Sequence, residues 1–267
     1  MIHQLTLNAR LFFRGAVLSY IALFAWLRPI TYLASKVVAP LMQILFFSIL
    51  GSFATGADTT DFYVVGNAVQ VVAMSGIFGV TMSIGGDRWN GTLPYLFGTP
   101  ANRLSMFVGR ALVHVLDGML GVFIGLGWGA LLLGLDLTLA DPLALVLTIL
   151  VTSFSTSGLG LMLGALSLIT VNVMFVNNMM YFLLLIFSGS NVDLATLPAW
   201  MQVISQWLPL TRGIAAARAI IDGAPLAEVS PLLTQETLIG IAYLLLGYLL
   251  FRWFEGQARR RGTLEMV

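Results

Sequence analysis

Long apolar runs separated by short polar stretches dominate the chain. A helix needs about 20 mainly apolar residues to cross the hydrocarbon core of a bilayer, and several runs approach or exceed that length. The six runs cover residues 37–54, 62–86, 104–135, 143–169, 171–188 and 238–254. Because the fourth and fifth runs almost touch, a tight hairpin is needed between them. The pattern predicts an all-α membrane protein with six transmembrane helices.

The stretch ahead of the first run, residues 1–36, has a different pattern. Its apolar part, Ala16–Leu27, is too short to cross a bilayer. Three arginines flank this part: Arg10, Arg14 and Arg28. Such a pattern is typical of a helix that lies in the membrane interface. The alternative is a first span that enters at Ala16 and buries Arg28 and Lys36, which is costly for cations.

Basic residues concentrate on alternate connections between the runs. They lie before the first run, between the second and third runs, and after the sixth run. These residues are Arg10, Arg14, Arg28, Arg88, Arg103 and Arg259–Arg261. The connections after the first and third runs hold aspartates and no cation. Cytoplasmic connections carry the excess of basic residues, so both termini and residues 87–103 are predicted to face the cytoplasm. Residues 37–267 then form one six-span domain.

The predicted outer connection, residues 189–236, is much longer than the other outer loops. Its first part is amphipathic and carries Trp200 and Trp207, which suit a membrane interface. Pro209 interrupts a helix there, and Thr211 is a candidate cap for the next one. We expect a re-entrant helical hairpin of two short helices before the last span. A plain amphipathic hairpin on the surface is the alternative.

Composition strengthens the membrane interpretation and excludes several kinds of site. The chain is 58% hydrophobic and 9% charged, with a mean hydropathy of +0.93, whereas soluble proteins carry about 25% charged residues. A net charge of +1 gives no indication of a nucleic-acid partner, and the absence of cysteine excludes disulfides and thiolate metal sites.

Motifs for catalysis are missing from the sequence. His3 and His114 are the only histidines, so the paired histidines of a zinc hydrolase cannot be formed. The glycine-rich phosphate loop that ends in lysine is also absent, since Lys36 is the only lysine. We expect no catalytic residue, no metal and no cofactor bound by this chain. Any energy from ATP must come from another polypeptide.

Several polar residues lie within the predicted spans. Arg110, His114 and Asp117 share one helical face because they are spaced four and three apart. They form either a polar pathway wall or a local cluster in which Asp117 is neutralised by neighbours on its own helix. Asn172, Asn177 and Asn178 are candidates to face a cavity, or else ordinary residues of the fifth span.

Glycines four apart, Gly121, Gly125 and Gly129, form a ridge on the third predicted span. Small residues at this spacing allow close helix packing. We expect packing within one subunit, with a dimer seam as the alternative.

A polar segment between the second and third runs carries the most specific pattern. It reads Asp87-Arg88-x-x-Gly91-Thr92-Leu93, followed by Thr99-Pro100. This resembles the acidic-Arg-x-x-Gly-Thr-Leu and Thr/Ser-Pro segment of ABC-2 type transporter permeases. A second pattern resembles the segment before the last span in the same family: Leu197, Pro198, Trp200, Pro209, Leu210 and Arg218. The chain departs from the family at Trp89 and Pro94, where charged and acidic residues are frequent.

The resemblance implies the transmembrane subunit of an ABC exporter in the inner membrane of a prokaryote. Two such subunits, identical or different, pair within the lipid, and their first and fifth spans line the path between them. Each inner loop docks on one of two cytoplasmic ABC ATPase subunits, which bind ATP and Mg. Trp89, Tyr95 and Phe97 offer aromatic anchors for that docking, unless the loop simply turns the chain.

The low charge favours an amphiphilic cargo such as a drug, a lipid or a lipid-linked glycan. The alternative function is an ATP-independent channel-like or scaffolding membrane subunit.

Overall fold

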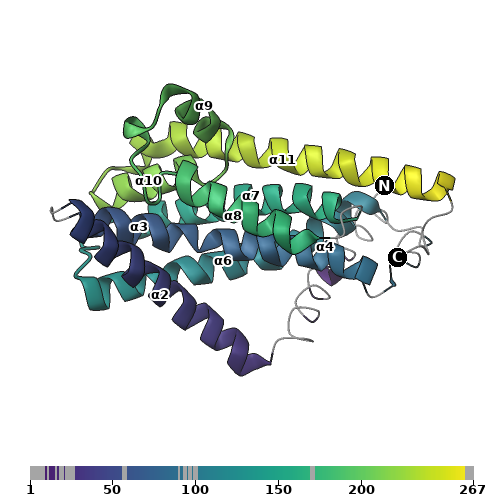
Figure 1. Cartoon of the computed structure of the whole chain (residues 1–267), viewed down its shortest axis with the longest axis horizontal. Helices are drawn as coiled ribbons and strands as arrows, with labels where there is room; N and C mark the ends of the chain where they lie inside the picture. The colour runs from purple at the N-terminus through teal and green to yellow at the C-terminus, as the bar shows by residue number, and fades with distance from the viewer. Residues whose placement is uncertain are drawn as a thin grey trace.

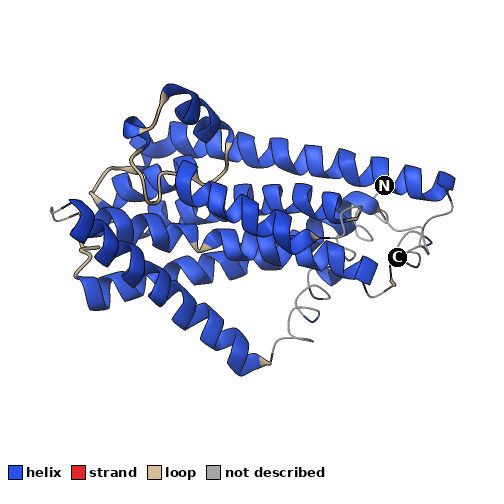
Figure 2. Cartoon of the chain, viewed as in Figure 1, coloured by secondary structure: helices blue, strands red, loops and turns tan. Residues whose placement is uncertain are grey.

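The computed structural model describes residues 10, 12–15, 17, 21, 28–55, 59–89, 91–92, 95, 98, 102–168 and 172–261, without the side chains of 87–89, 103 and 258–261. Across this part of the chain every regular element is a helix, as Figure 2 shows. The predicted all-α class is therefore confirmed. Of the predicted interfacial helix before Arg28, the structure describes residues 10, 12–15, 17 and 21, which are helical, and the rest lies outside the described residues.

The helices follow the apolar runs in order (Figure 1). They are α2 (Pro29–Thr55), α3 (Thr60–Gln70), the π-helix η1 (Met74–Gly79), α4 (Val80–Trp89), α6 (Arg103–Leu133), α7 (Pro142–Ser167), α8 (Val173–Phe187), the 3-10 turn η2 (Leu194–Thr196), α9 (Ala199–Trp207), α10 (Thr211–Ile221) and α11 (Leu226–Arg261). The break between α7 and α8 lies where the sequence required a hairpin.

Five of these segments are long and apolar enough to cross a membrane: Pro29–Thr55, Thr60–Gly86, Leu104–Leu133, Pro142–Ser167 and Leu226–Gln257. The fifth predicted span appears as α8, which has only 15 residues. At 1.5 Å per residue such a helix is about 22 Å long, less than a hydrocarbon core of about 30 Å. The described part of the chain thus contains five helical segments long enough to span a membrane and the shorter apolar helix α8, as expected for a multi-pass membrane protein.

The first long helix begins earlier than predicted, at Pro29 rather than Val37. Lys36 therefore lies inside α2, where sequence reasoning had treated it as part of the approach to the membrane. The cost of burying this cation is offset because Asp117 of α6 forms an ion pair with it.

The last long helix also begins earlier, at Leu226 rather than Leu238. Residues 226–236, predicted as part of the outer connection, are helical. Two of their polar side chains, Gln235 and Glu236, accept hydrogen bonds from the segment around the start of α10.

Glycines set the distance between the central helix α7 and its neighbours. A Cβ atom on Gly158 would lie 2.6 Å from the carbonyl oxygen of Gly240 in α11, and one on Gly164 would lie 2.6 Å from Ile84 in α4. Neither glycine can be enlarged without moving a neighbour. Gly125 faces Ala68 of α3 in the same manner, at 3.2 Å from its Cα. The glycine ridges therefore pack helices within this chain, as predicted.

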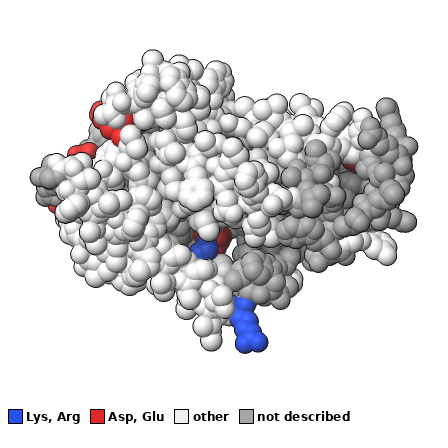
Figure 3. Space-filling view, viewed as in Figure 1, with Lys and Arg blue, Asp and Glu red and all other residues white. Residues whose placement is uncertain are grey.

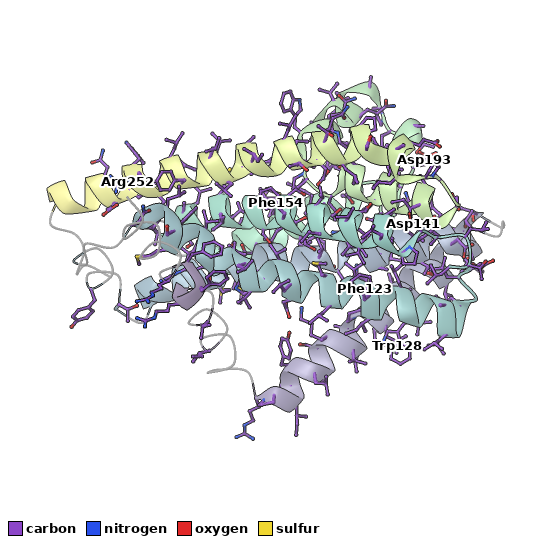
Figure 4. The ribbon with its side chains drawn as sticks, turned by 180° about the vertical axis from the view of Figure 1, so that it is seen from behind. Phe123, Trp128, Asp141, Phe154, Asp193 and Arg252 are labelled. Carbon is purple, nitrogen blue, oxygen red and sulfur yellow. The ribbon has the colours of Figure 1, made fainter. Side chains whose placement is uncertain are left out.

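The bundle has two distinct ends. One end carries α9, α10 and the connection between α6 and α7, and the other carries the end of α4 and the last turns of α11 (Figure 1). Figure 4 places Asp141 and Asp193 at the first end and Arg252 toward the second. The first end also carries Arg212 and Arg218 of α10, so which side of the membrane each end faces stays a prediction.

Candidate functional site

The mid-span charges meet in one cluster that joins three segments. Asp117 of α6 accepts hydrogen bonds from Lys36 and Tyr32 of α2 and from Ser75 of η1. The Lys36 ammonium also donates to Ser75 Oγ at 2.6 Å and to the Asp117 carbonyl at 3.4 Å. Its nitrogen lies 5.8 Å from the centre of the Tyr32 ring, within the range of a cation–π contact. The partner of Asp117 is thus on another helix, not on its own.

The cluster lies at a break in the second span. Ser75 belongs to η1, the π-helical turn between α3 and α4. Single π-turns inside α-helices frequently mark functional positions. His114, one turn before Asp117 on α6, is 1% exposed, and neither ring nitrogen has a hydrogen-bond partner among the described residues. Its ring fills the space that a side chain at Gly79 would need.

The cluster is mostly buried but keeps a small exposed surface at the side of the bundle. The side chains of Lys36 and Asp117 keep 15% and 8% of their surface exposed. Figure 3 shows basic and acidic atoms together in a recess near the middle of the face, apart from the acidic atoms at its upper left and the basic side chain at its lower edge. The recess exists because α2 packs on the bundle mainly through its later turns, while Ile30 and Leu33 are 83% and 62% exposed.

The other predicted polar candidates are not gathered in this cluster. Arg110 donates to the Ser83 carbonyl of α4 at 2.7 Å. Asn172 caps α8 by accepting from the Phe175 amide, and Asn178 donates to the Met174 carbonyl of its own helix. Asn177 is fully buried, and its amide has no partner among the described residues.

A second polar network joins α2, α3 and α8, and sequence reasoning missed it. Gln43 donates to Asn67 at 3.1 Å and accepts from the Tyr181 hydroxyl at 2.8 Å. Asn67 in turn donates to Asn191, just after α8, at 2.8 Å. Single amides within apolar runs were the available signal, but only the packing of the helices shows that they meet.

The two predicted short helices of the outer connection are present, and they differ in environment. On α9, Trp200 and Trp207 are 62% and 72% exposed. In contrast, α10 is embedded, with Ile214 and Ile220 at 1% and 0% exposure. Leu197 and Pro198 precede α9 on the surface, whereas Pro209 and Leu210 are buried in the connection to α10.

The prediction that Thr211 caps α10 is wrong. Leu210 occupies the cap position with φ of 82°, and the Thr211 hydroxyl has no partner among the described residues. Glu236 of α11 supplies the acceptor instead. Its carboxylate accepts hydrogen bonds from the Leu210 amide at 2.6 Å and from the Ser155 hydroxyl of α7. Glu236 is fully buried, and these two hydrogen bonds connect α11 to α7 and to the residue before α10.

Arg218 fastens the other end of α10. Its guanidinium donates to the Phe62 carbonyl at 2.8 Å and lies 3.6 Å from the centre of the Phe62 ring. Burial lowers the pKa of Arg218 to about 10, against an opposing effect of Asp193 and Asp222. The group therefore stays charged at neutral pH, and the embedded helix is anchored to the start of α3.

The segment predicted to dock a partner is described in part. Asp87, Arg88 and Trp89 end α4, and Gly91 then turns the chain with φ of 64°, a backbone conformation that favours glycine. Thr92 is exposed, and Tyr95 is helical and 78% exposed. Leu93, Phe97, Thr99 and Pro100 lie outside the described residues.

Comparison with known proteins gives the family. The family model described as ABC-2 type transporter matches residues 16–221. The chain belongs to this family. It is also 30% identical over 198 residues to the daunorubicin resistance ABC transporter permease protein DrrB1 of Streptomyces coeruleorubidus, with 70% of this chain and 67% of that protein covered.

Membership in this family explains both the apolar helices and the absence of catalytic motifs from the sequence. ABC-2 permeases are membrane transport subunits and not enzymes on their own, and they generally work with an ABC ATPase partner. The chain is thus an ABC exporter permease embedded in a membrane by several apolar helices. No group of three or more histidine or acidic side chains suited to a metal ion occurs in the described part.

Proposed function

We propose that this ABC-2 permease moves an amphiphilic substrate outward across the inner membrane of a prokaryote, driven by a separate ATPase that docks on residues 87–100. Drugs, lipids and lipid-linked glycans are the candidate cargo classes, and the name of the related drug-resistance permease favours the first. Both termini and the docking segment face the cytoplasm. ATP and Mg bind to the ATPase and not to this chain.

One observation carries the proposal: both helices that leave the docking segment lead to the mid-span cluster. On one side, α4 continues through η1 to Ser75, and on the other, α6 runs unbroken from Arg103 past Asp117 to Leu133. Asn102 begins α6 firmly because its side chain accepts from the Ser105 amide at 3.2 Å. A displacement of the segment by an ATPase would therefore reach Ser75 and Asp117 through two rigid elements.

The exposed faces of the bundle suit lipid and a second permease subunit, in a homodimer or heterodimer. Phe46 and Phe53 of α2 are 60% and 87% exposed, and Phe175 and Phe182 of α8 are 63% and 61% exposed. Large apolar side chains of this kind are buried either by acyl chains or by a partner. Two permease subunits would bring two docking segments and thus two ATPase copies.

The test is capture of the ATPase together with transport. The tagged chain should co-purify an ATPase expressed beside it, and inside-out vesicles should take up a fluorescent amphiphile only with hydrolysable ATP. Tyr95→Ala should weaken both capture and transport by about tenfold, because exposed aromatic anchors often dominate protein interfaces.

A matched control is Trp200→Ala, which removes an exposed aromatic at the opposite end of the bundle. It should leave capture unchanged. Transport without ATP by a chain that captures no ATPase would contradict the proposal and favour an ATP-independent channel-like or scaffolding subunit.

A further inference from the structure

The groups around the Lys36 ammonium make up a complete binding site for a primary ammonium ion. They are a carboxylate and a carbonyl of Asp117, the hydroxyl of Ser75 at 2.6 Å, and the ring of Tyr32 at 5.8 Å. Carboxylates, hydroxyls and carbonyls accept N–H bonds, and aromatic rings attract cations. In this structure Lys36 occupies the site with its own side chain.

We propose that this site binds the ammonium group of a lipophilic amine, which displaces Lys36 from Asp117. The inference rests on the proposed function and names the chemical class of its cargo. Exchange of one ammonium for another leaves the charge of the cluster unchanged, so Asp117 is never left unpaired within the bundle.

The Lys36 side chain has room for another position when a cargo amine displaces it from Asp117. Lysine carries its charge on a flexible four-carbon stem and extends readily toward water from apolar surroundings. The turns of α2 that precede it are exposed, with Ile30 at 83% and Leu33 at 62%. Lys36 can therefore extend toward the start of α2 while the cargo holds Asp117.

Apolar surface for the rest of such a cargo lies beside the cluster. Leu120, one turn beyond Asp117 on α6, is 59% exposed, and Met74, next to Ser75, is 45% exposed. Ligand sites commonly combine an apolar lining with a few precisely placed polar groups. A neutral amphiphile would gain the apolar contacts alone, and an anionic one has no ammonium group with which to replace Lys36 at Asp117.

The hydrogen-bond pattern also distinguishes between kinds of cation. Lys36 donates N–H groups to Ser75, to the Asp117 carbonyl and to the Asp117 carboxylate. A quaternary ammonium has no N–H to donate, so it would lose all three bonds. The site should therefore prefer primary amines.

The test uses dansylcadaverine, a fluorescent primary amine, and its uncharged N-acetyl derivative. The full chain is placed in lipid nanodiscs without nucleotide, and empty nanodiscs correct for partition into lipid. We expect the amine to bind about tenfold or more tightly than its acetyl derivative, because a charged hydrogen-bonded contact is lost on acetylation.

Two variants examine the site itself. The double variant Lys36→Met, Asp117→Asn removes both charges together, so that neither is left buried alone, and it should abolish the preference for the amine. The single variant Lys36→Met removes the internal competitor and should tighten amine binding severalfold. A matched control, Arg252→Met with Glu255→Gln, removes the ion pair on α11 and should keep the preference.

Equal binding of the two probes to the wild type would overturn the inference, as would an undiminished preference in the double variant. Weaker amine binding by Lys36→Met would likewise contradict it, because a purely structural ion pair predicts that result. The assay needs neither ATP nor ATPase. Loss of the preference with intact ATPase capture would thus reject the amine site alone, and loss of capture would reject the proposed function.

Discussion

At the scale of single residues, three ionisable side chains that are mostly buried join different parts of the chain. Asp117 holds α2 and η1 to α6, Glu236 holds α10 to α7 and α11, and Arg218 holds α10 to α3. Burying an ionisable group is costly unless partners within the protein replace part of its hydration. These residues therefore specify which helices meet.

Glu236 offers a direct test of this role. Glu236→Ala leaves the Leu210 amide buried without an acceptor, at a cost of about 1–3 kcal/mol, whereas the Ser155 hydroxyl can still donate to the Thr152 carbonyl at 3.1 Å. We expect a clearly lower midpoint of thermal unfolding, measured by size exclusion after heating in detergent. Glu236→Gln keeps an acceptor oxygen and should lower the midpoint less. Equal midpoints for the alanine variant and the wild type would contradict the bridging role.

At the scale of the element, the contact between α7 and α11 depends on backbone approaching backbone. Gly158 meets the Gly240 carbonyl oxygen, and Gly247 meets the Met162 amide, where added Cβ atoms would lie 2.6 Å and 2.8 Å away. Backbone atoms cannot yield as a flexible side chain can. The seam therefore accepts only glycine at these positions.

A pair of glycine substitutions separates this packing from helix propensity. Gly158→Ala should destabilise the protein, because its methyl group collides with α11. Gly127→Ala on α6, where nothing lies within 4 Å of an added Cβ, should be neutral or stabilising by up to about 1 kcal/mol from helix propensity. Thermal unfolding of the two variants measures the difference, and similar effects would show that the seam is not tightly packed.

At the scale of the whole molecule, the distribution of charge predicts orientation. The connections at the α9–α10 end carry aspartates beside Arg212 and Arg218, and the connection at the opposite end carries the docking segment with Arg88 and Arg103. Because the chain contains no cysteine, single cysteines can report their position without a background. This permits a labelling experiment in intact cells.

Leu139 and Tyr95 are suitable positions because they are 69% and 78% exposed and lie in the connections predicted to face opposite sides. Leu139→Cys should react with a membrane-impermeant maleimide in intact cells, and Tyr95→Cys only after permeabilisation. Labelling of Tyr95→Cys from outside would reverse the topology and exclude docking of a cytoplasmic ATPase on that segment.

The apolar runs determined the helical class, the order of the helices and the break near residues 167–172, because crossing a bilayer imposes length and hydrophobicity on each segment. Glycine spacing likewise predicted close packing. The two segment patterns indicated the family because both occur in one chain, at the places along the apolar runs where the family has them.

Only the tertiary structure decided which partners the charged side chains have. From sequence, Lys36 belongs outside the membrane, because an isolated cation is costly within it, and the first helix was consequently predicted to begin too late. Asp117, far away in the chain, removes that cost by pairing with it. The same reason applies to Glu236, which replaces the predicted cap of α10. Sequence fixes each local preference, but a charge finds its partner only through the packing of distant helices.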